Sequence, residues 1–107
     1  DAKFIEFAGY DMPVLYDTPE GGVKNEHLWT RASCGIFDVS HMGQVHIKGK
    51  DAAKLIEKIT VADTQAIAPG QATLTLLMNV MGGIKDDCIV TKVNEDHFYV
   101  VFNAGCK

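Results

Sequence analysis

Three strand-like segments separated by short breaks constrain the fold of this 107-residue chain more than any other feature. The segments are Thr73–Asn79, Ile84–Val93 and His97–Asn103. Each is rich in β-branched, aliphatic or aromatic residues, as strands are. The breaks at residues 80–83 and 94–96 are short enough for hairpins, which join antiparallel neighbours. The sequence therefore predicts an antiparallel β-meander over about residues 73–103.

Two short helices are predicted before the meander. Residues 23–34 contain no strong helix breaker, and Gly35 stands where a left-handed residue would end a helix. Asp51 can cap a second helix, in which apolar residues recur at spacings of three and four. These apolar residues are Ala52, Leu55, Ile56 and Ile59.

The other segments are predicted to be extended or irregular. Residues 3–7, 36–39 and 44–48 have the composition of strands, whereas several prolines and glycines favour an irregular loop over residues 8–22. The Pro69-Gly70 pair favours a tight turn, because proline fixes one central residue and glycine permits positive φ at the next. The expected fold class is therefore α+β, with mixed α and β structure, an antiparallel meander and two short helices.

Composition and charge argue against several classes of function. Acidic residues outnumber basic ones by 14 to 10, and Arg31 is the only arginine, so no nucleic-acid partner is expected. The longest apolar run, residues 98–102, is far too short to cross a membrane. The 3 cysteines are widely spaced and odd in number, which favours a reducing compartment over a disulfide framework. The sequence starts at Asp1 and shows no basic-then-apolar leader pattern, so we expect any targeting segment to be removed or absent.

The second predicted hairpin places an acid beside an amide. If residues 94–96 form its loop, Val93 pairs with His97. Counting back along both strands then pairs Asp87 with Asn103. Directly opposed residues of two strands have Cβ atoms roughly 4.5–5.5 Å apart. The two polar side chains are therefore expected to lie side by side.

The first predicted hairpin adds aliphatic neighbours to this pair. If residues 80–83 form its loop, Asn79 pairs with Ile84 and Leu76 with Asp87. Alternate side chains of a strand share a face, and one miscounted loop residue would move a strand's side chains to the other face. The predicted face contains Leu74, Leu76, Asp87, Ile89, Val101 and Asn103.

A carboxylate and a carboxamide on such a face would form a polar pair among aliphatic side chains. A flat, partly polar heterocycle could stack there and be fixed by Asp87 and Asn103. A partly buried Asp87 could also exchange a proton with a bound amine. The alternative is that Asp86 and Asp87 are solvated charges at the end of a strand, because acids cluster beside turns. On the residues alone, both interpretations stay open.

Other candidate residues have simpler structural interpretations. Asp38, Ser40 and His41 are the residue types of a hydrolase triad, but adjacent residues of an extended segment point to opposite faces. The 4 histidines lack the spacing of metal ligands, so no metal site is expected. By default Cys106 is a small apolar residue and Met42 fills space in a core.

Several segments, taken in order, are similar to one family, the aminomethyltransferases, which are the T-proteins of the glycine cleavage system. The matching segments are Phe7-Ala8-Gly9-Tyr10, Met12-Pro13-Val14, residues 35–42, residues 79–87 and Asn103-Ala104-Gly105-Cys106. The resemblance covers essentially the whole chain. Tyr10 stands where many members have tryptophan, which leaves the resemblance intact.

The resemblance implies an enzyme that uses tetrahydrofolate. Members of this family take the methylene carbon from the aminomethyl-lipoyl arm of a carrier protein, the H protein, and pass it to tetrahydrofolate with release of ammonia. Carried over residue by residue, Asp87 matches the family's catalytic acid. Met42, Leu74 and Asn103 match positions that line its folate pocket. Three of these four residues also belong to the face that hairpin counting predicts, and this agreement favours the catalytic interpretation of Asp87.

The resemblance also sets expectations for the rest of the molecule. Family members have several hundred residues, so residues 1–107 are expected to be the N-terminal portion of the folate-binding region and to be inactive alone. The compartment would be the cytoplasm in bacteria or the mitochondrial matrix in eukaryotes. Alternatives are the folate-binding portion of a sarcosine or dimethylglycine dehydrogenase-like enzyme, a non-catalytic folate-binding module, or an inert folding fragment. A strand exposed at residues 97–103 could also pair two copies.

Overall fold

The computed structural model describes residues 2–107. Their contacts divide the chain into two compact units, one ending at His41 and the other beginning at Met42. The sequence contains no Pro-, Gly- or Ser-rich linker that marks this boundary. The α+β class is confirmed, because both units combine helix with antiparallel strands.

The first unit opens with a β-hairpin of β1 (Ala2–Phe7) and β2 (Tyr10–Tyr16). The turn residues Ala8 and Gly9 both have positive φ, 51° and 82°, as in the turns that match the twist of a hairpin. The expected strand at residues 3–7 is confirmed, but the loop expected over 8–22 is wrong where β2 forms. Pro13 fits into β2 because it pairs with Phe4 beside a register shift, in a ribbon with only one neighbouring strand.

Helix α1 (Val23–Ala32) follows the hairpin. Glu26 in its first turn accepts at Oε1 a hydrogen bond from the backbone N–H of the N-cap residue Gly22 (3.0 Å) and another from the backbone N–H of Tyr16 (2.8 Å), the last residue of β2. The helix ends at Ala32, earlier than expected, and Gly35 does not adopt positive φ. The expected strand at residues 36–39 is also wrong, because these residues have no regular secondary structure.

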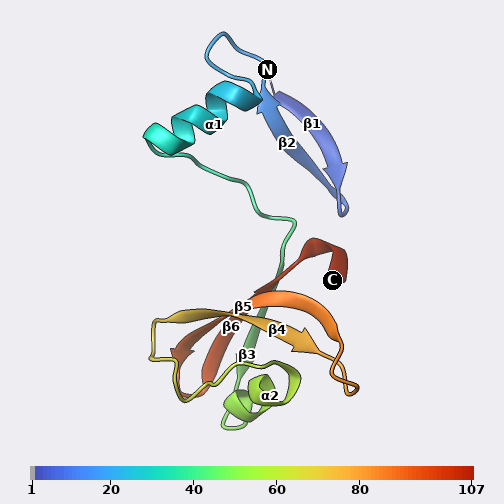
Figure 1. The fold of residues 1–107 in the computed structure, drawn as a ribbon, viewed down its shortest axis with the longest axis vertical. Coiled ribbons are helices and arrows are strands. Elements are labelled where there is room, and N and C mark those ends of the chain that lie inside the picture. Colours follow the sequence, from blue (N-terminus) through green and yellow to red (C-terminus); the bar gives the residue numbers. More distant parts are fainter. Residues whose placement is uncertain (1) are drawn as a thin grey trace. The chain divides into compact units, whose positions relative to one another are not determined.

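The second unit contains the predicted meander. Its elements are β3 (Gly43–Lys48), α2 (Ala52–Ile59), β4 (Ala72–Met78), β5 (Ile84–Asn94), β6 (His97–Phe102) and a 3-10 turn η1 (Ala104–Cys106). The strands form one antiparallel sheet in the order β3-β6-β5-β4 (Figure 1). The predicted edge position of residues 97–103 is wrong, because β3 comes from an earlier part of the chain and pairs with β6. The edges are β3 and β4.

The predicted register is correct at the centre of the sheet and wrong beside both turns. Ile84 pairs with Met78 rather than Asn79, and His97 pairs with Asn94 rather than Val93. Each shift is a bulge next to a turn, so it leaves the register further along the strands unchanged. The confirmed central pairs are Leu74–Ile89, Leu76–Asp87 and Ile89–Val101.

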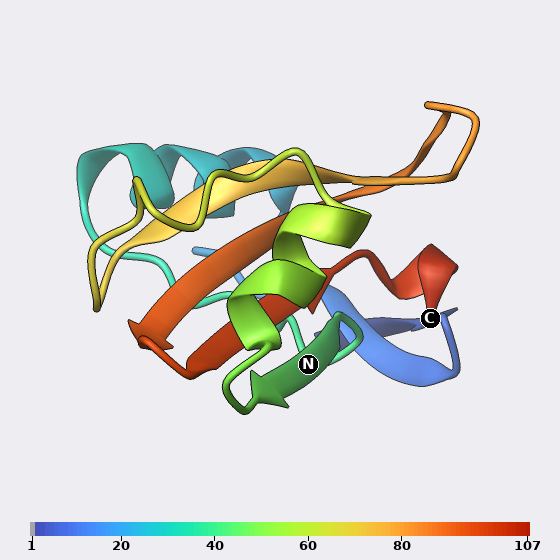
Figure 2. The ribbon, with the colours of Figure 1, turned by 90° about the horizontal axis from the view of Figure 1, so that it is seen from below.

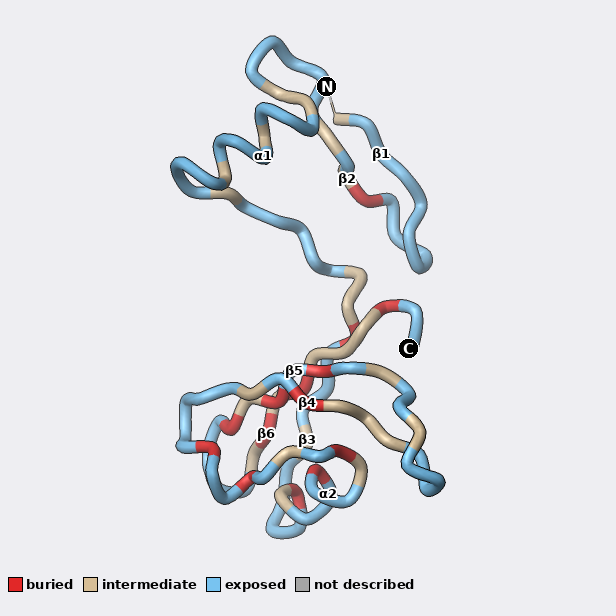
Figure 3. Tube along the Cα trace, viewed as in Figure 1, coloured by how far each residue is buried: buried red, intermediate tan, exposed pale blue. Residues whose placement is uncertain are grey.

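Only one face of this sheet is covered within the second unit. Helix α2 lies across that face (Figure 2), and the buried residues in Figure 3 concentrate on α2, β5 and β6. The core consists of Ala52, Ile56, Cys88, Val90, Phe98 and Val100. The opposite face carries aliphatic side chains with large exposed fractions, 69% for Leu74 and 45% for Ile89. We call the side chains of Leu74, Leu76, Asp87, Ile89 and Val101 the open face.

The Pro69-Gly70 turn is confirmed. The Gln71 N–H donates to the Ala68 carbonyl (3.0 Å), and Gly70 has a φ of 83°. We expect Gly70→Ala to destabilise the protein by about 1–2 kcal/mol, because a Cβ disfavours the left-handed region. Thermal unfolding should show a Tm lower by roughly 4–8 °C per kcal/mol in a domain of this size. Gly105→Ala is the matched control, since Gly105 lacks positive φ and its added Cβ meets open space. Equal Tm values for both variants would contradict the prediction.

Candidate active site

The predicted contact between Asp87 and Asn103 is present. Asp87 lies in β5 opposite Leu76 of β4, and Asn103 directly follows β6. Because Cys88 pairs with Phe102, the next residue on each strand is Asp87 and Asn103. The Asn103 Nδ2 donates a hydrogen bond of 2.7 Å to the Asp87 Oδ1. The acid and the amide therefore lie side by side, as hairpin counting predicts.

Asp86 contacts the same amide, which the sequence interpretation missed. Asn103 Nδ2 donates to Asp86 Oδ1 (2.8 Å), and the Asn103 backbone N–H donates to Asp86 Oδ2 (3.0 Å). Strand alternation alone would turn Asp86 away from Asp87. The contact is possible because Asn103 lies beyond the last residue of β6, where its backbone N–H is free of the ladder. These hydrogen bonds from Asn103 hold the pKa of Asp86 below its usual value, so Asp86 is ionised at neutral pH.

The surroundings of the pair are more open than expected. Asp87 is exposed within its unit, so the expected partial burial is wrong for this part of the chain. Its neighbours on the open face are aliphatic: Leu74 lies two residues along β4 from Leu76, which pairs with Asp87. The arrangement is a carboxylate held by an amide at the end of an exposed apolar sheet face.

Met42 lies at the same end of the sheet as Asn103. Gly43, the first residue of β3, pairs with Phe102, the last residue of β6. Met42 and Asn103 are each one residue further along, so they leave neighbouring strands at one end. The structure thus brings Asp87 and Asn103 into contact, places Leu74 on their face and places Met42 at their end of the sheet.

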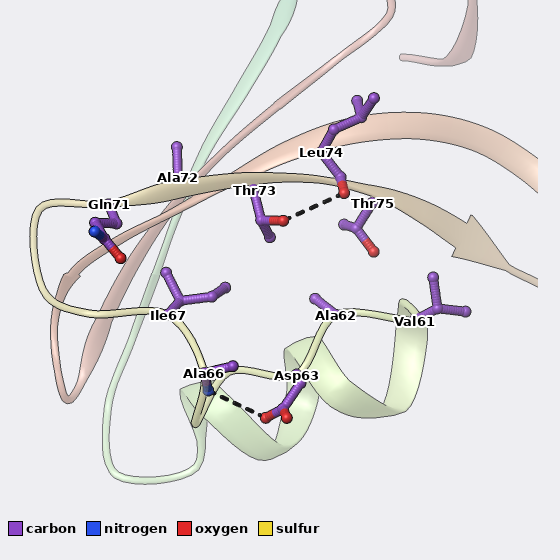
Figure 4. A pocket seen from close by; sticks show the side chains of 10 residues that line it. All are labelled: Val61, Ala62, Asp63, Ala66, Ile67, Gln71, Ala72, Thr73, Leu74 and Thr75. Carbon is purple, nitrogen blue, oxygen red and sulfur yellow. Dashed lines mark hydrogen bonds between the residues drawn. The ribbon is translucent and has the colours of Figure 1, made fainter.

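A cavity of about 320 Å³ lies along the edge of β4, away from this pair. Its lining includes Asp63, Ile67, Thr73 and Thr75, but neither Asp87 nor Asn103 (Figure 4). Figure 4 shows the side chain of Leu74 on the opposite side of β4 from those of Thr73 and Thr75. The Thr73 and Thr75 side chains therefore lie on the cavity side of β4, whereas the Leu74 side chain lies on the side of the open face.

The remaining candidate residues, Asp38, Ser40, His41 and Cys106, make the following contacts. Ser40 Oγ and N–H both donate to Asp38 Oδ1 (2.6 and 2.9 Å), and these bonds lower the pKa of Asp38. The His41 ring instead packs edge-on against Phe7, with ring centroids 5.1 Å apart. Cys106 is exposed, but desolvation and the Asp86 carboxylate raise its thiol pKa and disfavour the reactive thiolate.

Residues 2–107 contain neither a cluster of metal ligands nor a membrane-spanning helix. No group of three or more His, Cys, Asp or Glu side chains in this range is arranged to hold a metal ion. No helix in the same range is long and apolar enough to cross a membrane. The three cysteines, Cys34, Cys88 and Cys106, are all free.

The family match and the similar proteins indicate the same family. Residues 1–107 match the family described as the GCVT N-terminal domain. The chain is 50% identical over 105 residues to the mitochondrial aminomethyltransferase of Dictyostelium discoideum, covering 98% of this chain and 25% of that protein. It is 48% identical over 104 residues to the mitochondrial aminomethyltransferase of Homo sapiens, covering 97% of this chain and 25% of that protein.

A solved structure supports the same assignment. The crystal structure of glycine cleavage system aminomethyltransferase T from Bartonella henselae matches with a TM-score of 0.86 and 41% identity, covering 97% of this chain and 28% of that chain. The chain therefore spans about a quarter of the length of the curated relatives it matches. Over that span, the chain belongs to the GCVT N-terminal domain family.

Proposed function

We propose that the full-length protein is a tetrahydrofolate-dependent aminomethyltransferase of the glycine cleavage system. It would move the methylene carbon from an aminomethyl-lipoyl carrier protein to tetrahydrofolate, giving methylenetetrahydrofolate, ammonia and the reduced dihydrolipoyl arm. Residues 1–107 would form the N-terminal portion of its folate-binding region. The observation that carries the proposal is the Asp87–Asn103 pair at the end of the exposed apolar face, in a chain whose relatives are named aminomethyltransferases.

The residues of the open face fit the chemistry of a reduced folate. A flat heterocycle can stack on the exposed Leu74 and Ile89 side chains, while polar groups at one end fix its orientation. The Asp87 carboxylate is acceptor-only and suits a ligand N–H. Because both protons of the Asn103 Nδ2 are directed at carboxylates, its Oδ1 is left as a second acceptor. The proposed ligand therefore presents N–H donors to this end of the sheet.

We assign the roles as follows within this proposal. Tetrahydrofolate supplies the amine nitrogens that accept the carbon. Asp87 orients these nitrogens, takes part in proton transfer and stabilises the positive charge that develops as ammonia leaves. Asn103 holds the Asp87 carboxylate, and Leu74 and Met42 contribute apolar contacts. Positioning of the two reactants adds to the rate, since a correctly oriented pair avoids much of the entropy cost of the reaction.

The proposed partners and compartment follow from the same assignment. The carbon donor would be the lipoylated H protein, and the small-molecule partner would be a folate. Relatives at 48–50% identity are named as mitochondrial proteins. We therefore propose the mitochondrial matrix if the source is a eukaryote and the cytoplasm if it is a bacterium.

An assay of the full-length protein tests this function. We expect ammonia release that requires both the aminomethylated H protein and tetrahydrofolate. Turnover of sarcosine or dimethylglycine in place of the H protein would favour a dehydrogenase-like relative. Folate binding without either reaction would favour a non-catalytic binding module.

Leu74→Ala tests whether folate lies on the open face. Truncation removes aliphatic surface that would be buried under the ligand, at about 0.8 kcal/mol per methylene. We expect the Kd for tetrahydrofolate to rise about tenfold in calorimetric titration. Leu55→Ala is the matched control, because Leu55 is also exposed but lies on α2, against the opposite face. Equal affinities in both variants would place the ligand elsewhere.

A further inference from the structure

We propose that Asp86 is a positioning residue that acts through Asn103 to fix the carboxylate of Asp87. The inference rests on the proposed function, in which Asp87 is the catalytic acid. It concerns a residue that strand alternation assigns to the other face. Three hydrogen bonds carry it, and all of them meet at Asn103.

The hydrogen bonds allow only one orientation of the Asn103 side-chain amide. Its Nδ2 carries two protons, and these are donated to Asp86 Oδ1 (2.8 Å) and Asp87 Oδ1 (2.7 Å). A rotation of the amide by a half turn would point its oxygen toward two carboxylates, which are acceptors only when ionised. Two neighbouring carboxylates therefore determine which end of the amide faces them and which end faces a ligand.

Asp86 also holds the backbone of Asn103. Its second oxygen, Oδ2, accepts the Asn103 backbone N–H (3.0 Å) just where β6 has ended. One carboxylate thus holds both the main chain and the side chain of Asn103. Without Asp86, the amide would be held only by Asp87, the group that it is meant to position.

The engagement of Asp86 distinguishes its role from that of Asp87. Both Asp86 oxygens accept hydrogen bonds from Asn103, and Asp86 is half-buried. The Asp87 carboxylate accepts one hydrogen bond from the same amide, which also lies 3.5 Å from the Asp87 backbone carbonyl, and Asp87 is exposed, so its carboxylate can meet a ligand. The lowered pKa of Asp86 agrees with this assignment, because the ionised form is the one that accepts all of these bonds.

Asp86→Asn tests the proposal in the full-length protein. The variant keeps the size of the side chain, but the uncharged amide holds Asn103 less strongly. We expect kcat to fall about tenfold, with little change in the Kd for tetrahydrofolate. The substitution disturbs the orientation of the Asp87 carboxylate but removes no contact between the protein and the folate. Asp96→Asn is the control, since Asp96 lies in the turn at the other end of the same hairpin and should leave kcat unchanged. An unchanged kcat in Asp86→Asn would overturn the proposal.

A double-mutant cycle tests whether Asp86 acts through Asn103. The variants are Asp86→Asn, Asn103→Ala and the combination, each checked for an unchanged Tm. We expect the combined variant to match Asn103→Ala alone in kcat, because the route from Asp86 to Asp87 is already removed. Effects that multiply instead would show that Asp86 acts independently, and the positioning role would be rejected.

A readout without catalysis separates this inference from the proposed function. The side-chain amide protons of Asn103 are both hydrogen-bonded, so NMR should show slow exchange with water. We expect exchange to be faster in Asp86→Asn and unchanged in Asp96→Asn. Faster exchange together with full turnover in Asp87→Asn would support the positioning by Asp86 but reject the catalytic role of Asp87. Unchanged exchange in Asp86→Asn would reject the positioning itself.

Discussion

Asp87→Asn is expected to lower kcat of the full-length protein about 100-fold or more while tetrahydrofolate still binds. The substitution keeps the shape of the side chain but removes the negative charge and the capacity to exchange a proton. The introduced amide would also have to turn its oxygen toward the Nδ2 of Asn103 to keep the hydrogen bond between the two side chains. Steady-state kinetics with the aminomethylated H protein, together with calorimetry for the folate, would measure both quantities.

The comparison with neighbouring acids makes this result specific. Asp86→Asn leaves the proposed catalytic carboxylate in place and should lower kcat about tenfold. Asp96→Asn should leave kcat unchanged. Near-normal turnover in Asp87→Asn would remove this residue from the mechanism. A loss of folate binding as large as the loss of turnover would instead make Asp87 a ligand-binding residue without a role in the chemistry.

Phe98→Ala is expected to destabilise the protein by about 3–5 kcal/mol. Phe98 is fully buried in β6, where it packs in the cluster that includes Ile56 of α2 and Val90 of β5. Truncation would leave a cavity between the sheet and α2, and interiors close such cavities only in part. The loss is large compared with the roughly 5–15 kcal/mol by which most domains are stable.

Urea denaturation would measure this effect as a lower midpoint with an unchanged slope. Phe98→Leu is the matched control, because it leaves a smaller cavity at the same position and should cost less than Phe98→Ala. The same midpoint for Phe98→Ala and the unsubstituted protein would mean that β6 and α2 do not form the core described above.

The centre of the meander could be predicted from the sequence because strand periodicity leaves little choice there. Two short turns fix the pairing of β4, β5 and β6, and a period of two then decides which side chains share a face. The Leu76–Asp87 and Ile89–Val101 pairs could be predicted in this way. The contact between Asp87 and Asn103 followed from the same counting.

The features that were missed depend on contacts between distant segments or on local backbone adjustment. The pairing of β3 with β6 joins segments far apart in the sequence, so hairpin counting could not place β6 inside the sheet. The bulges beside Ile84 and His97 each absorb one residue without changing the pattern of residue types. The presence of Pro13 favoured a loop over a strand, although a hairpin strand with only one neighbouring strand accommodates proline. Asp86 was missed because it contacts Asn103, a residue beyond the end of β6, through both the main-chain N–H and the side-chain amide.

The two bulges have a consequence for protein engineering. They mark positions where the chain already accommodates a single extra residue while the strands beyond keep their pairing. A tag or loop inserted at the turn between Asn94 and His97 should therefore leave the acid and the amide in contact, since both lie at the far end of that hairpin. One residue added between Asp87 and Lys92 would instead turn the acid to the α2 side, away from Asn103 and from the exposed aliphatic side chains.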